Sequence, residues 1–202
     1  MPALSEKRRV ILGGLAGSCV FLALGLYAAD KQDYKVGDRL PQKPAQGSAG
    51  YKEMTWDALM PADWNPAKEF QALDLANLSD SDPRAMKALE QLRAALDNAP
   101  VVAALNGARI RIAGFTVPLE SARGQISEFL LVPYFGACIH TPPPPANQIV
   151  HVRLDKPHRS LGTMDTVWIS GRLQLARAST VHGVSGYALA GQRVERYAAP
   201  AR

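Results

Sequence analysis

Two side chains with metal-binding and nucleophilic chemistry, Cys138 and His140, stand two residues apart, and four consecutive prolines follow them. Thiolate and imidazole are good ligands for zinc and copper(I). In an extended segment the side chains at positions i and i+2 point to the same side, so both could reach one ion. The pair therefore predicts a metal site, with zinc as the candidate cofactor.

The prolines give this segment its second possible role. Proline fixes φ near −65° and has no backbone N–H, so four in succession favour a stiff polyproline II rod. Two amide side chains follow where the chain re-enters a strand. A rigid loop with polar groups suits a ligand or a partner protein. We expect the binding loop to include Pro142, Pro143, Pro144, Pro145, Asn147 and Gln148.

Three interpretations of the Cys138 loop remain open. Two ligands are too few for a closed zinc site, so His151, His158 or His182 would have to complete it. Alternatively Cys138 is a nucleophile with His140 as its base, although no orienting acid is evident. In the third interpretation Cys138 is a small buried side chain, and the loop serves protein interaction. The sequence holds no phosphate-binding glycine loop, CxxC or HExxH motif, and it favours a non-enzymatic protein.

The N-terminus predicts a membrane anchor. Three basic residues within a short tail, 1–9, precede the uncharged apolar run 10–29. Twenty helical residues rise about 30 Å, the thickness of a bilayer core, and the flanking charges place the tail in the cytoplasm. A cleaved signal ending near Ala28 and a lipoprotein signal at Cys19 are the alternatives. All three predict export, here to the periplasm on a single-pass inner-membrane anchor.

The remaining chain divides into a linker and a globular domain, 51–202. The stretch 30–50 is rich in glycine and proline and reads as a flexible linker. Residues 51–100 predict a helical cover: a short helix capped by Thr55, then a longer one from Asp82-Pro83 to Asp97. The longer helix carries an apolar stripe of Met86, Leu89, Leu92 and Leu96.

From residue 101 the pattern changes to that of β-strands. Five short strands with intervening turn signals predict a small antiparallel barrel. The fold class is therefore mainly β with short helices (α+β), a five-stranded OB-like barrel over residues 101–197. The predicted strands cover residues 109–119, 128–132, 149–154, 166–175 and 186–197.

Composition adds two limits. An apolar fraction of 47% allows a core, and the net charge is +5. Residues 101–202 hold 11 Lys and Arg against 5 Asp and Glu, so an anionic surface such as lipid headgroups is a candidate partner. No basic cluster interleaved with aromatic residues is present, and we expect no nucleic-acid partner.

The motif running from Cys138-x-His140 through the four prolines to Asn147-Gln148 resembles an uncharacterised bacterial family of exported proteins, catalogued as a domain of unknown function. The segments 114–120, 129–133 and 55–61 are also similar to it, so the likeness spans about residues 51–197. Family members tend to be periplasmic proteins or lipoproteins, whereas this chain has a long apolar segment without a clear lipoprotein signal. The resemblance implies an accessory role in metal homeostasis or beside an export-type ABC transporter of the envelope.

Overall fold

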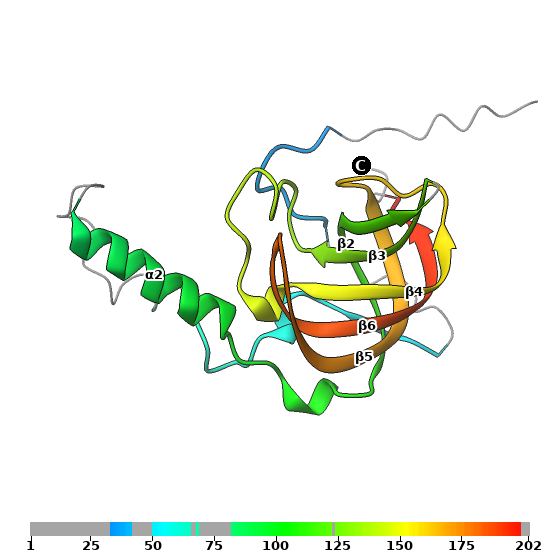
Figure 1. The fold of residues 1–202 in the computed structure, drawn as a ribbon. Helices are drawn as coiled ribbons and strands as arrows, with labels where there is room; N and C mark the ends of the chain where they lie inside the picture. Colours follow the sequence, from blue (N-terminus) through cyan, green and yellow to red (C-terminus); the bar gives the residue numbers. More distant parts are fainter. Residues whose placement is uncertain (1–32, 42–49, 66–67, 69–81, 123, 199–202) are drawn as a thin grey trace, which may run out of the picture. The chain divides into compact units, whose positions relative to one another are not determined.

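The computed structural model describes residues 33–41, 50–65, 68, 82–122 and 124–198 (Figure 1). The predicted anchor, residues 10–29, lies outside these ranges. Among the described residues, no helix has the length and apolar character needed to cross a bilayer. The elements are β1 (Lys52–Met54), η1 (Asp57–Leu59), α2 (Pro83–Asp97), η2 (Ala103–Leu105), β2 (Arg109–Ala122), β3 (Gln125–Val132), η3 (Ala146–Gln148), β4 (Val150–His158), β5 (Thr166–Thr180) and β6 (Gly183–Arg196).

The five long strands close into a barrel. Their order is β2-β3-β4-β6-β5, and β5 pairs back onto β2, while the short β1 adds to β2. This confirms the five-stranded barrel that the sequence predicts. The expectation of purely antiparallel pairing is wrong, because β4 and β6 run parallel from the Val150–Tyr187 pair to the Leu154–Gly191 pair. The crossover between these two strands is β5 itself, which pairs with β2 on one side and with β6 on the other.

Alternating side chains on the barrel strands build the interior core. Each strand points every second residue inward, so β-branched and aromatic side chains from all five strands meet. This alternation is the signal that located the strands in the sequence. The barrel's contribution to the core consists of Ile110, Ile112, Ile126, Phe129, Leu131, Val150, Val152, Val167, Ile169, Leu173, Tyr187 and Leu189.

A short segment preceding the barrel completes this core. Met54, Trp56 and Leu59 are buried among the barrel's interior side chains, with Leu59 fully inaccessible. The Trp56 indole N–H donates to the Ala113 carbonyl at 2.7 Å, and the Tyr187 hydroxyl donates to the Leu59 carbonyl at 2.8 Å. We call residues 54–59 the plug. The N-cap position of η1 is held by Trp56 and not, as the sequence predicts, by Thr55, although the Thr55 side-chain oxygen accepts from the Ala58 N–H.

The longer helix forms as predicted but covers less of the barrel than expected. Asp82 caps α2 by accepting from the Arg84 N–H, and Pro83 occupies the first turn. Two residues of its apolar stripe, Met86 and Leu89, are 65% and 54% exposed. Residues 66–67 and 69–81 lie outside the described ranges, so the helical cover over residues 51–100 stays a prediction. Among the described residues of this region, it is chiefly the plug that fills the barrel, because its large side chains point inward.

The segment Tyr34–Pro41 packs on the outside of the barrel, so the predicted linker over 30–50 is wrong for these residues. The compact unit begins at Tyr34. Tyr34 packs edge-on against Phe115 at 5.1 Å between ring centroids, and Leu40 is buried. The Tyr197 hydroxyl donates to the Pro41 carbonyl. Two large side chains and several backbone hydrogen bonds thus attach this glycine- and proline-rich stretch to the barrel.

This outer surface is a second hydrophobic cluster. Its buried members come from β2, β3, β5 and the residues before β4, and the Tyr34–Pro41 segment covers part of it. Without that cover, these apolar side chains would face water. The buried residues of the outer cluster are Leu40, Ala113, Phe115, Val117, Leu130, Val132, Ala137, Ile149 and Trp168.

One glycine fixes how closely β5 approaches β6. A Cβ atom added at Gly171 would lie 2.1 Å from the Ala190 carbonyl oxygen, a distance no real contact allows. We expect Gly171→Ala to lower the free energy of unfolding by about 1–3 kcal/mol, as overpacking does. Chemical denaturation monitored by circular dichroism measures the change. The control is Gly162→Ala, whose added Cβ meets its nearest neighbour at an ordinary 3.8 Å. Equal stability of the two variants would contradict this strand packing.

Candidate functional site

The loop between β3 and β4 is folded around one carbonyl group. The Gly136 carbonyl oxygen accepts from the backbone N–H groups of His140 at 2.8 Å, Thr141 at 3.2 Å and Ile139 at 3.3 Å. The Gly136 N–H in turn donates to the Met164 sulfur at 3.2 Å. Backbone bonds also join the loop to the outer segment, from the Gly37 N–H to the Phe135 carbonyl and from the Phe135 N–H to the Asp38 carbonyl. The loop is therefore a tight, anchored turn.

Cys138 does not lie in an extended segment, so the geometric premise for the Cys138–His140 pair is wrong. Its φ is +65°, in the left-handed region, and residues 135–140 form successive turns. The pairing of side chains at i and i+2 holds only for extended backbone. The three hydrogen bonds to the Gly136 carbonyl impose the turn instead.

The Cys138 side chain packs against the outer hydrophobic cluster. This burial raises the pKa of the Cys138 thiol to about 12. The thiol is therefore protonated at neutral pH, whereas nucleophiles and metal ligands are thiolates. His140, by contrast, is exposed.

The histidines proposed as further ligands have other surroundings. His151 contacts Glu128, and His158 accepts the Ser160 N–H at its Nδ1 atom. Across the ranges the structure describes, no three His, Cys, Asp or Glu side chains group closely enough to hold a metal ion. The structure thus does not bring His151, His158 or His182 together with the Cys138 loop in such a group.

The proline run leads into η3, and the two amide residues that follow face inward. Pro142 is exposed, Pro144 is buried, and Pro145 has the polyproline II angles φ −54° and ψ 149°. Asn147 is fully buried, and its side-chain N–H donates to the Pro100 carbonyl at 2.8 Å. Gln148 donates to the Trp56 carbonyl, also at 2.8 Å. Both amides therefore hold the segments preceding the barrel, including the plug.

An exposed surface remains at the tip of the loop. Ile139 is 38% exposed, and His140 and Pro142 are exposed beside it. Val36, from the outer segment, is 54% exposed. A Cβ placed on Gly136 would touch both Val36 and His140, so these two side chains lie on the same side of the turn. We call Val36, Ile139, His140 and Pro142 the loop patch.

The sequence did not predict a charged cluster that Glu128 on β3 forms with His151 and Arg153 on β4. The His151 Nε2 atom lies 2.5 Å from a Glu128 carboxylate oxygen, which also accepts from Arg153 at 3.2 Å. Although partial burial of the Glu128 carboxyl opposes ionisation, the hydrogen bonds from His151 and Arg153 outweigh it and lower its pKa. Leu130 pairs with His151 and Glu128 with Arg153 across the two strands. The strand parity of His151 was readable from the sequence, but this register was not.

These features define a closed five-stranded β-barrel domain with an N-terminal plug and a rigid, proline-rich loop. The chain belongs to the family described as protein of unknown function (DUF3299), which it matches over residues 56–196. A crystal structure of a DUF3299 family protein from Pseudomonas aeruginosa PAO1 is similar, with 34% sequence identity and a TM-score of 0.57. The match covers 75% of this chain and 99% of that one. No curated protein is significantly similar to this chain.

The half-buried Cys138 thiol should react slowly. In a Cys19→Ser variant of the full chain, Cys138 is the only thiol. We expect its reaction with an aromatic disulfide probe at pH 7.5 to be about a hundredfold slower than that of glutathione, because few molecules carry a thiolate and access is restricted. The rate should keep rising with pH beyond pH 10, since the pKa lies near 12.

Unfolding the same variant in denaturant serves as the control and should restore an ordinary thiol rate. A fast native reaction that levels off between pH 7 and 8 would show that the thiol is exposed and acidic.

Proposed function

We propose that this protein is a membrane-anchored, exported accessory protein, without enzymatic activity, whose barrel presents the loop patch to a partner protein of the cell envelope. One observation carries the proposal. The half-buried Cys138 side chain packs against the outer cluster, while Ile139, His140 and Pro142 of the same loop are exposed to solvent. The reactive side chain of the motif is therefore packed against the barrel, and the side chains that a partner could contact are exposed.

The loop patch has the make-up of a protein-binding surface. Two exposed aliphatic side chains, Val36 and Ile139, stand beside an imidazole and a proline ring. Apolar groups rimmed by polar ones are typical of interaction sites. The hydrogen bonds to the Gly136 carbonyl hold the patch in shape before a partner arrives, and this reduces the entropic cost of binding.

The metal-site and nucleophile interpretations would need a different environment around Cys138. A zinc site at Cys138 and His140, or a nucleophilic Cys138, requires a thiolate. Burial raises the pKa of the Cys138 thiol to about 12, which disfavours a nucleophilic thiolate. A zinc ion would have to displace the thiol proton and draw the side chain away from its packing on the outer cluster. The interaction role requires no such change and is the one we favour.

The location and the class of partner rest on the sequence. Residues 10–29 are long enough to span the inner membrane, with the barrel on the periplasmic side. The family resemblance suggests an export-type ABC transporter as the partner. A tethered barrel would then meet a membrane-embedded partner by diffusion in two dimensions, and a modest patch would suffice.

Site-specific photo-crosslinking tests the proposal. With benzoylphenylalanine in place of Ile139 in the full-length protein, expressed in its own bacterium, we expect an ultraviolet-dependent adduct with an integral membrane protein. The matched control places the same group at Met86, which is also apolar and exposed, on α2. The adduct should be absent there. No adduct at Ile139, or the same adduct from both positions, would contradict a role for the loop patch.

A further inference from the structure

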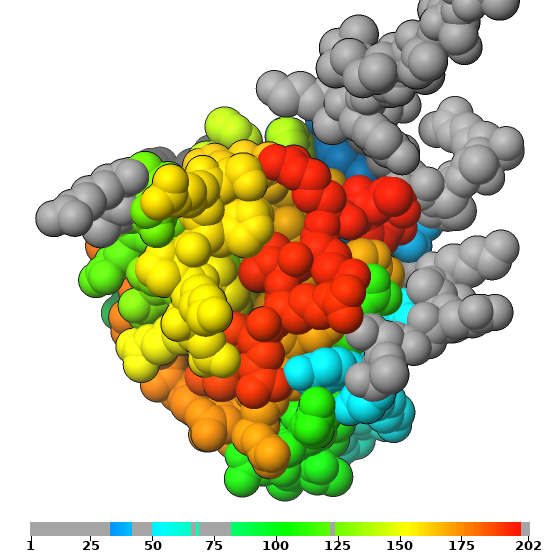
Figure 2. Space-filling model, turned by 90° about the vertical axis from the view of Figure 1, so that its right-hand side faces the viewer, coloured from blue at the N-terminus to red at the C-terminus, as the bar shows by residue number. Residues whose placement is uncertain are grey.

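A cleft opens where the parallel strands β4 and β6 separate. Their pairing ends at Leu154 and Gly191, after which β4 continues beside β3 and β6 beside β5. Figure 2 shows the face on which these two strands lie next to each other, in yellow and red. The cavity between them has a volume of about 320 Å³. This lies at the small end of the range for organic ligands.

Irregularities in both strands produce the cleft. Gln192 is an extra residue in β6, between the pairs that Gly191 and Arg193 make with β5. On β4, the register with β3 shifts between Arg153 and His158. Such bulges turn side chains away from the regular alternation and are frequent beside functional sites. Here they direct four polar side chains, Asp155, Lys156, His158 and Gln192, to the rim of one cavity.

Hydrogen bonds already present determine what two of these groups can offer a ligand. The Gln192 Oε1 atom accepts from the Tyr51 hydroxyl at 2.7 Å, which leaves the amide N–H groups as donors. The His158 Nδ1 atom accepts from the Ser160 N–H, so the proton of a neutral ring resides on Nε2. With the Lys156 ammonium, three donors surround the cavity. In the described part of the chain, Lys156 forms no ion pair.

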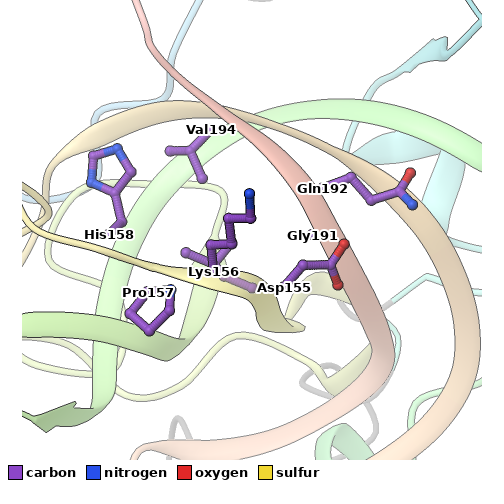
Figure 3. Close-up of a pocket in the computed structure, with 8 residues that line it drawn as sticks. Asp155, Lys156, Pro157, His158, Gly191, Gln192 and Val194 are labelled. Carbon is purple, nitrogen blue, oxygen red and sulfur yellow. The ribbon is translucent and has the colours of Figure 1, made fainter.

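The close-up shows how these groups are distributed. In this view the Lys156 ammonium lies between the His158 ring on one side and the Gln192 amide and Asp155 carboxylate on the other (Figure 3). One side of the cavity therefore offers the His158 donor beside the Lys156 ammonium, and the other offers the Asp155 acceptor together with the Gln192 amide. The rest of the lining is largely apolar and consists of Leu154, Pro157, Gly191 and Val194.

We propose that this cleft binds a small hydroxylated organic acid, such as a sugar acid. Its carboxylate contacts Lys156 and His158, its hydroxyl groups donate to Asp155, and its carbon framework lies on the apolar lining. Charge-assisted hydrogen bonds to the carboxylate supply much of the affinity. The cleft adjoins the end of β4, whereas the Cys138 loop precedes its start. The inference is independent of the proposed partner-binding function.

Saturation-transfer difference NMR on the full-length protein in detergent micelles tests the cleft with three probes. D-glucuronate has both the carboxylate and the hydroxyl groups, D-glucose lacks the carboxylate, and cyclohexanecarboxylate lacks the hydroxyl groups. We expect saturable binding of glucuronate and at least about tenfold weaker binding of the other two, because each lacks one set of contacts. Equal binding of glucose and glucuronate, or no saturable signal from glucuronate, would overturn the proposal.

Two lysine variants locate the binding. Lys156→Gln should weaken glucuronate binding by about tenfold or more, since it removes the ammonium group that contacts the ligand carboxylate. Lys87→Gln, an exposed lysine on α2, is the matched control and should leave the dissociation constant unchanged. Both should melt at the wild-type temperature, because these side chains are exposed. An unchanged affinity in the Lys156 variant would rule out this cleft as the site.

Discussion

The structure depends on a plug that must be held inside a barrel. A five-stranded barrel encloses a core that side chains from its own strands and from Trp56 and Leu59 fill together. The plug carries backbone carbonyls into this interior, and a buried carbonyl without a partner is costly. Gln148 donates to the Trp56 carbonyl, and Tyr187 donates to that of Leu59. These two hydrogen bonds, together with packing, hold the plug inside the barrel.

The need to hold the plug in place explains the structural role of the Cys138–Gln148 motif. Its end supplies Gln148 and Asn147, which bind the segments before the barrel, and its start packs Cys138 into the outer cluster. The prolines connect these two anchored ends with few degrees of freedom. A motif that resembles a metal site by residue type thus acts as a structural bridge between the two hydrophobic clusters. In our proposal, recognition falls to its exposed tip.

Much of the fold was readable from the sequence, and the site was not. Strand alternation located all five barrel strands, and Asp82-Pro83 marked the start of α2, because both signals are local. The parallel β4–β6 pair and the packing of Tyr34 depend on contacts between distant segments, which periodicity does not encode. The direction of the Cys138 side chain depends on a left-handed φ, which is rare outside glycine. The Glu128–His151 contact likewise needed the strand register.

The central claim is that the Cys138 loop is structural and leaves recognition to its surface. Calorimetric titration of zinc into the reduced full-length protein in detergent tests this claim most directly, with Cys138→Ser and His140→Ala as companions. The account predicts no saturable one-to-one binding, and the same weak heats in all three proteins, because the thiol stays packed and protonated. Micromolar or tighter one-to-one binding that both substitutions abolish would contradict it and would establish a metal site at Cys138 and His140.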